Sequence, residues 1–176
     1  MAKSRKKKKS NAALTYNVRN YFDSGRVVKL PLGPTYLAEI PAEDGQLIRL
    51  ITITREHING NKAYATFVID ASCSCIDTGY YDYNVADEII DVVIKEYGLQ
   101  VYDDYLALRD TIYAVYTNAK QLGNAKDPQL PFALKILEGD SGDAPKKRSL
   151  IKDWTSGKSA FDKRGESLNR EKGKTS

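Results

Sequence analysis

The chain of 176 residues is 41% hydrophobic and 28% charged, and its formal net charge is +4 at pH 7. These values are close to the averages of globular proteins, so they exclude a wholly disordered chain, and the length suits one domain better than two. No apolar run reaches the roughly 18 residues that a membrane span needs, and the charged N-terminus lacks the apolar stretch of a secretory signal. We therefore expect neither membrane insertion nor secretion.

The charges fall into three blocks along the chain. Residues 1–30 hold nine basic residues against one acid, residues 31–138 hold eight against sixteen, and residues 139–176 hold ten against six, which gives net charges of +8, −8 and +4. Dense like charges repel one another and leave no apolar group to bury. We expect an acidic globular α+β domain over residues 30–138, with basic, largely disordered tails at 1–29 and 139–176.

The first elements expected along the chain form a β-hairpin. Residues 27–32 indicate only the start of an interrupted strand. Residues 47–56 alternate Ile and Thr, which predicts a half-buried strand. Asn59-Gly60 then favours the two positive-φ positions of a tight turn. Residues 63–70 should therefore pair back on the first strand in a small antiparallel sheet.

A stretch rich in Ser, Gly, Asp and Tyr follows the hairpin. Its composition favours a structured loop from Asp70 to Asn84 over a regular core element. The two cysteines, Cys73 and Cys75, lie one residue apart in it, a spacing whose geometry disfavours a mutual disulfide. Packing as small apolar side chains is the simpler role for them, and a reducing, cytoplasmic compartment fits.

Two or three helices are expected after this loop. The first covers residues 85–97 and has Asn84 as its N-cap and a glycine just after its end. The second runs from Asp103 or Asp104 to the next glycine, and the third covers about 128–138. One face of the second helix is apolar: Leu108, Ile112, Val115, Tyr116 and Ala119. Strands followed by helices indicate an α+β fold, with the helices packed on the hairpin sheet.

His57, Asp70 and Cys73 have the chemistry of a metal site or a hydrolytic site. Histidine titrates near neutral pH and thiolates bind zinc, but a structural zinc normally has four protein ligands and the sequence offers no evident fourth. No partner motif for catalysis surrounds His57, so a solvated turn residue is the simpler interpretation. We predict no catalytic residue, no metal and no cofactor.

Tyrosine is used heavily, with 12 residues in the chain. Several have helical spacing and are interpreted as core. Tyr80, Tyr81 and Tyr83 differ, because they stand together in the predicted loop, and such rings suit a protein interface or stacking on bases. The predicted interaction loop comprises His57, Asp70, Cys73, Tyr80, Tyr81, Tyr83 and Asn84.

The basic tails carry the strongest functional signal. Six basic residues crowd into Lys3 to Lys9, and such clusters bind phosphates by releasing counterions without needing a fold. The same tails suit folding back on the acidic domain. The predicted nucleic-acid contacts are Lys3, Arg5, Lys6, Lys7, Lys8, Lys9, Lys146, Lys147 and Arg148, with Trp154 adding a stacking contact.

Four pieces of the sequence recur together in a known family. They are the lysine run at residues 6–9, the stretch Arg55 to Asn61, the stretch Ile69 to Cys73, and the pair Tyr81 and Asn84. In order and spacing, about two thirds of the chain resembles a family of uncharacterised bacterial proteins. The family pattern is a Lys-rich start, Arg-x-His-x-x-Gly-Asn and then an Asp-x-x-Cys block, and some members carry a C-terminal SEC-C zinc motif.

The resemblance has limits that decide what it implies. Residues 74–77 replace the Leu-Gly-Val-Lys centre of the family block, and no SEC-C cysteine cluster follows. Any zinc-dependent role of longer members is therefore not implied here. The resemblance implies the domain boundaries and a bacterial cytoplasm, and it draws attention to five positions: His57, Asp70, Cys73, Tyr81 and Asn84.

Three functional hypotheses follow from the sequence. The first is a non-enzymatic accessory protein that binds RNA or a ribonucleoprotein such as the ribosome through its basic tails. The alternative is a protein-protein interaction module that meets a basic partner through the acidic domain and the tyrosine-rich loop. The third is a small hydrolase or metalloprotein centred on His57, Asp70 and Cys73. The sequence does not distinguish RNA from DNA and gives no oligomeric state.

Overall fold

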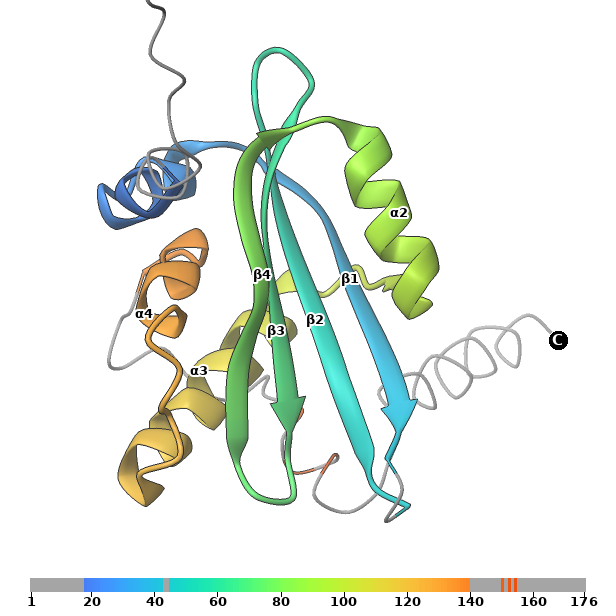
Figure 1. The fold of residues 1–176 in the computed structure, drawn as a ribbon, viewed down its shortest axis with the longest axis vertical. Coiled ribbons are helices and arrows are strands. Elements are labelled where there is room, and N and C mark those ends of the chain that lie inside the picture. Colours follow the sequence, from blue (N-terminus) through green and yellow to red (C-terminus); the bar gives the residue numbers. More distant parts are fainter. Residues whose placement is uncertain (1–17, 43–44, 140–149, 151, 153, 155–176) are drawn as a thin grey trace, which may run out of the picture.

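The structure, a computed structural model, describes residues 18–42, 45–139, 150, 152 and 154. Its centre is a five-stranded sheet in the order β4-β3-β2-β1-β5, in which every neighbouring pair is antiparallel (Figure 1). The strands are β1 (Leu32–Pro41), β2 (Leu47–Glu56), β3 (Lys62–Asp70), β4 (Cys75–Val85) and β5 (Gln100–Val101). The helices are α2 (Asp87–Tyr97), α3 (Tyr105–Leu122) and α4 (Leu130–Ala133), with short 3-10 turns η1 (Val27–Lys29) and η2 (Leu134–Ile136). The expected α+β fold is confirmed.

The hairpin of β2 and β3 forms where the alternating pattern predicts it. Its register runs from Ile48 opposite Asp70 to Glu56 opposite Lys62. The connecting loop differs from the prediction, because Gly60 has a φ of 85° while Asn59 is not among the residues with positive φ. The loop is longer than a two-residue turn: the His57 amide donates to the Asn61 carbonyl at 2.8 Å, so only one left-handed residue is needed.

Strand β1 is a full ten-residue strand rather than an interrupted start. The Gly and Pro residues near its beginning coincide with a register shift between Leu32 and Thr35. A Cβ at Gly33 would lie 2.5 Å from the Thr54 hydroxyl oxygen, so β1 and β2 approach closely there only because residue 33 has no side chain. The Gly and Pro residues near the start of β1 thus mark a β-bulge, and the strand continues beyond it.

The expected loop from Asp70 to Asn84 is wrong over most of its length, because residues 75–85 form β4. Its Gly and Asp residues are tolerated because β4 is an edge strand with irregular pairing. One register shift falls where Phe67 pairs with Thr78 and Thr66 pairs with Tyr80, which leaves Gly79 as the extra residue. Such a bulge exchanges the faces on which the following side chains point.

The helices cover both faces of the sheet. On one face the buried residues Leu37, Ile53 and Phe67 belong to the same core as Leu108 and Ile112 of α3. The predicted apolar face of α3 is confirmed: Leu108, Ile112, Val115 and Ala119 are fully buried and Tyr116 is partly buried. On the other face α2 packs over two smaller groups of buried residues. Figure 1 shows α2 on its own side of the strands, away from α3 and α4.

The helix ends agree with the prediction at α3 and differ at α2. The Asp104 carboxylate accepts from the Ala107 amide at 3.0 Å, which is the expected N-cap of α3. Gly98 ends α2 in the left-handed conformation, also as expected. The N-cap of α2 is Ala86, not Asn84, whose side chain is drawn instead to the hairpin loop.

The core extends past both predicted boundaries of the domain. Residues 18–23 are helical, and Phe22 and Val27 are fully buried, although the sequence placed them in a disordered tail. Leu150 and Trp154 are also buried, and the Leu150 amide donates to the Thr111 hydroxyl at 2.8 Å. A few apolar anchors within a basic segment are enough to dock it, because burial depends on single side chains and not on net charge.

Candidate functional site

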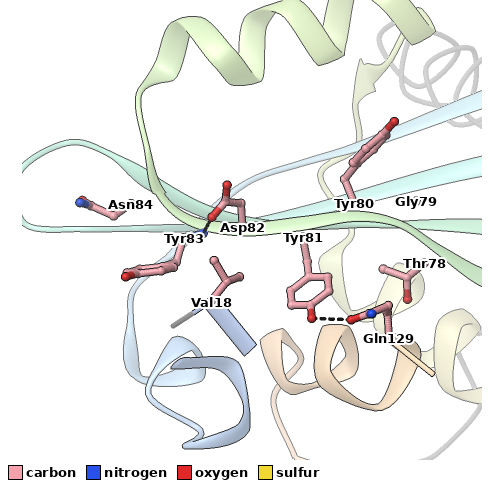
Figure 2. Close-up of a pocket in the computed structure, with 9 residues that line it drawn as sticks. All are labelled: Val18, Thr78, Gly79, Tyr80, Tyr81, Asp82, Tyr83, Asn84 and Gln129. Atoms are coloured by element: carbon pink, nitrogen blue, oxygen red, sulfur yellow. Dashed lines mark hydrogen bonds between the residues drawn. The ribbon is translucent and has the colours of Figure 1, made fainter. Parts of the chain in front are cut away.

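Strand β4 forms one edge of the sheet and presents side chains to both faces. Tyr81 pairs with Ala65 and points toward the helices at 18–23 and α4, whereas Tyr80 pairs with Thr66 and points toward the side of α2 (Figure 2). Tyr80 is 59% exposed, so its ring lies on the molecular surface. The bulge at Gly79 produces this arrangement, since regular pairing would have put Tyr80 among the helices.

A pocket of about 590 Å³ opens along this edge. Figure 2 shows that it spans the outer side of β4 between the helix at 18–23 and the segment before α4. Its lining residues are Val18, Thr78, Gly79, Tyr80, Tyr81, Asp82, Tyr83, Asn84 and Gln129. We call it the β4 pocket. It has the size of a ligand or peptide site, and three of its nine lining residues are tyrosines.

Ring contacts fix the helix side of the pocket. The Tyr83 ring stacks on Tyr21 with a centroid distance of 4.7 Å, and the Tyr81 ring meets Phe22 edge-on at 5.0 Å. The Tyr81 hydroxyl donates to the Gln129 side-chain oxygen at 2.7 Å. These contacts hold both tyrosines in one orientation, so the wall is already formed before anything binds.

Three polar groups stand in or beside this wall. The Thr78 amide donates to the Asp127 carboxylate at 2.7 Å, which occupies one end of the strand edge. The Thr78 hydroxyl is buried and has no hydrogen-bond partner among the described residues. The Asp82 carboxylate accepts from the Tyr83 amide at 2.7 Å. The unpaired Thr78 hydroxyl lies beneath the surface of the pocket, where leaving it without a partner is costly.

Burial shifts the titration of two tyrosines at the pocket. Desolvation raises the pKa of Tyr81 above its ordinary value of 10.0, against a smaller lowering influence of Arg19. Desolvation also raises the pKa of Tyr21, with Arg26 opposing it. Both hydroxyls therefore stay protonated at neutral pH and act as neutral hydrogen-bond donors and acceptors.

Acidic side chains occur on β4 and on α2. Asp77 and Asp82 belong to β4, and Glu88 and Asp91 are exposed on α2. Exposed apolar side chains lie among them: Ile89 is 50% exposed and Val92 is 61% exposed. β4 and α2 thus carry both negative charge and exposed apolar side chains, a combination that suits a basic, partly apolar partner.

The predicted interaction loop is only partly assembled. Tyr80, Tyr81, Tyr83 and Asn84 all line the β4 pocket. Asn84 has a φ of 57°, and its side-chain oxygen accepts from Asn59 at 3.0 Å and from Asn61 at 3.2 Å. It therefore fastens the hairpin loop to the end of β4.

His57 lies near the pocket without lining it. Its ring centroid is 6.0 Å from that of Tyr21, the ring that stacks on Tyr83. Its Nε2 is buried and has no hydrogen-bond partner among the described residues, and burial lowers the pKa of His57 below its ordinary 6.5. His57 thus supports the helix at 18–23 as a neutral ring.

The hypothetical centre of His57, Asp70 and Cys73 is wrong, because the three residues lie at opposite ends of the hairpin. His57 follows β2, whereas Asp70 ends β3, and eight residue steps of a strand separate those ends by roughly 26 Å. Cys73 forms a disulfide with Cys75, with their Cα atoms 5.2 Å apart, which corrects the expectation of free cysteines. The turn between β3 and β4 brings the two sulfurs together despite the short spacing.

The described part of the chain shows neither a metal cluster nor a membrane-spanning helix. No group of three or more His, Cys, Asp or Glu side chains within it is placed to hold a metal ion. None of its helices combines the length and the apolar character needed to cross a membrane.

The predicted nucleic-acid contacts lie mostly outside the described residues. This holds for Lys3, Arg5, Lys6, Lys7, Lys8, Lys9, Lys146, Lys147 and Arg148. Trp154 is described, and only 3% of it is exposed. Its ring lies 4.5 Å from the guanidinium carbon of Arg49, so the structure places Trp154 in the core, where no base can stack on it.

Sequence reasoning did not find Val18, Thr78 and Gln129 as parts of the site. Gln129 meets Tyr81 across a separation of 48 residues, and no local pattern encodes such a contact. One signal is available in the sequence, because the third helix is predicted to begin at about residue 128, directly after Asp127. Asp127 does accept from the Gln129 amide at 2.8 Å, and it also binds β4.

Comparison of the chain with protein-family profiles, with curated proteins and with solved structures gives no match. We therefore infer the function from the geometry of the β4 pocket and from the charges on the domain.

Proposed function

We propose that this protein is a protein-interaction module that binds a basic, extended segment of a partner along the outer edge of β4. The β4 pocket carries this proposal, because it places three tyrosine side chains directly beside the edge of a sheet. An edge strand offers backbone groups to an added strand, and neighbouring pockets for alternate side chains supply specificity. The proposal ranks the second hypothesis from the sequence above the first.

The charge of the domain defines the chemistry of the partner. Residues 31–138 carry a net charge of −8, and Asp77 and Asp82 lie on the strand itself. Complementary charge speeds association and selects against acidic partners. We therefore expect a segment with Lys or Arg residues flanking alternating apolar side chains.

A peptide selection on the full chain tests this function. Random 12-residue peptides displayed on phage are selected on the protein, and the enriched peptides are measured by fluorescence anisotropy. We expect basic peptides with alternating apolar residues, whose affinity falls about tenfold or more in the Tyr80→Ser, Asp82→Asn double variant, because an aromatic anchor and a charge are lost together.

The matched control is Leu122→Ser, which removes an apolar side chain that is 64% exposed on α3, away from the pocket. This variant should bind the selected peptides like the wild type. Peptides that bind equally to the wild type and to the double variant would show that the partner uses another surface.

Nucleic-acid binding stays a second candidate because of one observation. Residues 1–30 carry a net charge of +8, and counterion release alone gives such a segment affinity for RNA. The measurement is binding of a 20-nucleotide RNA at 50 mM and 200 mM salt. Replacement of Lys6 to Lys9 by Ser should weaken the affinity strongly and reduce its salt dependence, because four phosphate contacts are lost. An unchanged affinity would eliminate this candidate.

We propose a cytoplasmic location on the grounds given by the sequence, and the Cys73–Cys75 disulfide is the feature that opposes it. Alkylation of thiols at the moment of cell lysis, followed by mass spectrometry, shows whether the two cysteines are reduced or disulfide-bonded in the cell. Two alkylated cysteines support the cytoplasm, whereas an intact disulfide indicates an oxidising compartment.

A further inference from the structure

The chain enters the described structure inside the β4 pocket. Val18 is the first described residue, and it is one of the residues that line the pocket. The helix that follows is held firmly in place: Phe22 is fully buried, and the Arg19 guanidinium lies 3.9 Å from the Phe132 ring centroid. The chain therefore starts its described course at the wall of the pocket, where Figure 2 shows Val18 between Tyr81 and Tyr83.

The segment before Val18 has the length to follow the whole edge of β4. Seventeen residues span up to about 56 Å when extended, whereas Thr78 to Asn84 covers about 20 Å. Even residues 12–17 alone match the length of the pocket. The segment before Val18 is therefore long enough to contact β4 over the whole length of the pocket.

The composition of the segment matches the partner that the pocket requires. Ala12, Leu14 and Tyr16 alternate with other residues at the two-residue period of a strand. Six basic residues between Lys3 and Lys9 precede them. The pocket offers tyrosine rings for the apolar residues. Asp77, Asp82 and Glu88 offer acids for the basic residues, whereas Asp87 is already paired with Lys62 at 2.6 Å.

We propose that residues 1–17 occupy the β4 pocket of their own chain and compete there with the external partner. This inference rests on the proposed function, since it assigns the regulation of the same site. An attached segment acts at an effective concentration on the order of 1 mM. If its intrinsic dissociation constant is on the order of 0.1 mM, the apparent affinity for a competing peptide falls about tenfold.

The test compares full-length chains with a peptide probe. The probe is a fluorescein-labelled synthetic peptide with the sequence of residues 3–17, measured by anisotropy at 50 mM salt. The released variant carries Leu14→Ser, Tyr16→Ser and Ser at Lys6 to Lys9, which removes both the apolar anchors and the charge. The control variant carries Lys158→Ser, Lys163→Ser and Arg164→Ser, so charge is lost elsewhere.

We expect the released variant to bind the probe about tenfold more tightly than the wild type and the control variant. Adding Tyr80→Ser and Asp82→Asn to the released variant should remove that binding. In the wild type, amide resonances of residues 78–84 should differ from those in the released variant, because the attached segment contacts them.

Two results would overturn the inference without deciding the proposed function, which has its own test. Equal binding of the probe by wild type and released variant means that the pocket accepts the sequence but is not occupied in cis. Absence of binding by both means that residues 3–17 are not a ligand at all. The peptide selection described above decides the proposed function independently in either case.

Discussion

His57 illustrates how a single buried atom determines a pH dependence. Its Nε2 has no hydrogen-bond partner among the described residues, and desolvation lowers the pKa of His57 in the folded chain below the ordinary 6.5. When the pH falls through 6.5, the unfolded chain takes up a proton that the folded chain does not bind. The unfolding free energy is therefore largest above pH 6.5 and decreases as the pH falls.

We predict that urea unfolding shows a lower midpoint at pH 5.5 than at pH 7.5. His57 is the only histidine in the sequence, so His57→Gln should remove most of this difference. The carboxylates titrate equally in the wild type and in the Gln variant, so the difference between the two proteins reports on His57 alone. A wild type with equal midpoints at both pH values would contradict the assignment of a neutral, half-buried ring.

Arg55 is a second residue whose role follows from its contacts alone. It is 1% exposed, and its guanidinium donates to the Ile136 carbonyl at 3.2 Å, to the Leu30 carbonyl at 3.2 Å and to the Tyr105 hydroxyl at 3.3 Å. Glu138, at 3.1 Å, is 53% exposed and supplies the opposite charge from the surface. Arg55 thus connects the chain before β1 and the chain after α4 to the end of β2, the central strand of the sheet.

Arg55→Met should lower the unfolding free energy by about 2–3 kcal/mol, because it leaves these carbonyl groups without a donor in a buried place. The measurement is equilibrium unfolding in urea. Lys126→Met, which changes the same kind of side chain at an exposed position, should stay within about 0.5 kcal/mol of the wild type. A small effect of Arg55→Met would mean that water replaces the lost donors.

At the level of the elements, two glycines in β-bulges allow a matched comparison. An added Cβ at Gly33 would lie 2.5 Å from the Thr54 hydroxyl oxygen and 3.1 Å from Glu56 Cγ, closer than real contacts allow. An added Cβ at Gly79 would meet Thr66 Cγ2 and Val68 Cγ2 at 3.5 Å each, which is ordinary contact. Neither glycine has a positive φ, so the space around it decides the outcome.

We predict that Gly33→Ala destabilises the protein by about 1–3 kcal/mol through this clash, while Gly79→Ala is neutral or stabilises it by up to about 1 kcal/mol. Thermal unfolding followed by far-UV circular dichroism measures both. The prediction fails if the two variants lose the same stability, since the residue change is identical.

The same elements show which signals are local. The hairpin of β2 and β3 and the ends of α3 are predictable, because Ile/Thr alternation, Asp104 and Gly123 act within a few residues. β4 was missed because its pairing with β3 tolerates Gly79 only through a bulge, which depends on the partner strand. The tyrosines of the site were found from composition, but the opposite wall comes from residues 18 and 129, which only the tertiary fold brings near.

At the level of the whole molecule, two distant segments complete one core. Phe22 and Trp154 belong to the same buried cluster, although the sequence assigned both to disordered tails. Net charge gave the wrong boundary there, because it averages over residues, whereas docking needs only a few anchors. Leu150 and Trp154 are such anchors: Leu150 binds Thr111 of α3, and Trp154 covers Arg49 of β2.

This arrangement predicts that the segment around Trp154 unfolds together with the sheet. Trp154 is the only tryptophan, so its fluorescence reports on that segment, while far-UV circular dichroism reports on the whole fold. Because Trp154 contacts the buried Arg49 and Leu150 contacts the buried Thr111, we expect the two urea transitions to coincide. Trp154→Ala should lower the unfolding free energy by about 3 kcal/mol, with Trp154→Phe as the milder control. A fluorescence transition at clearly lower urea than the circular dichroism transition would mean that the segment detaches on its own, as the charge pattern by itself predicts.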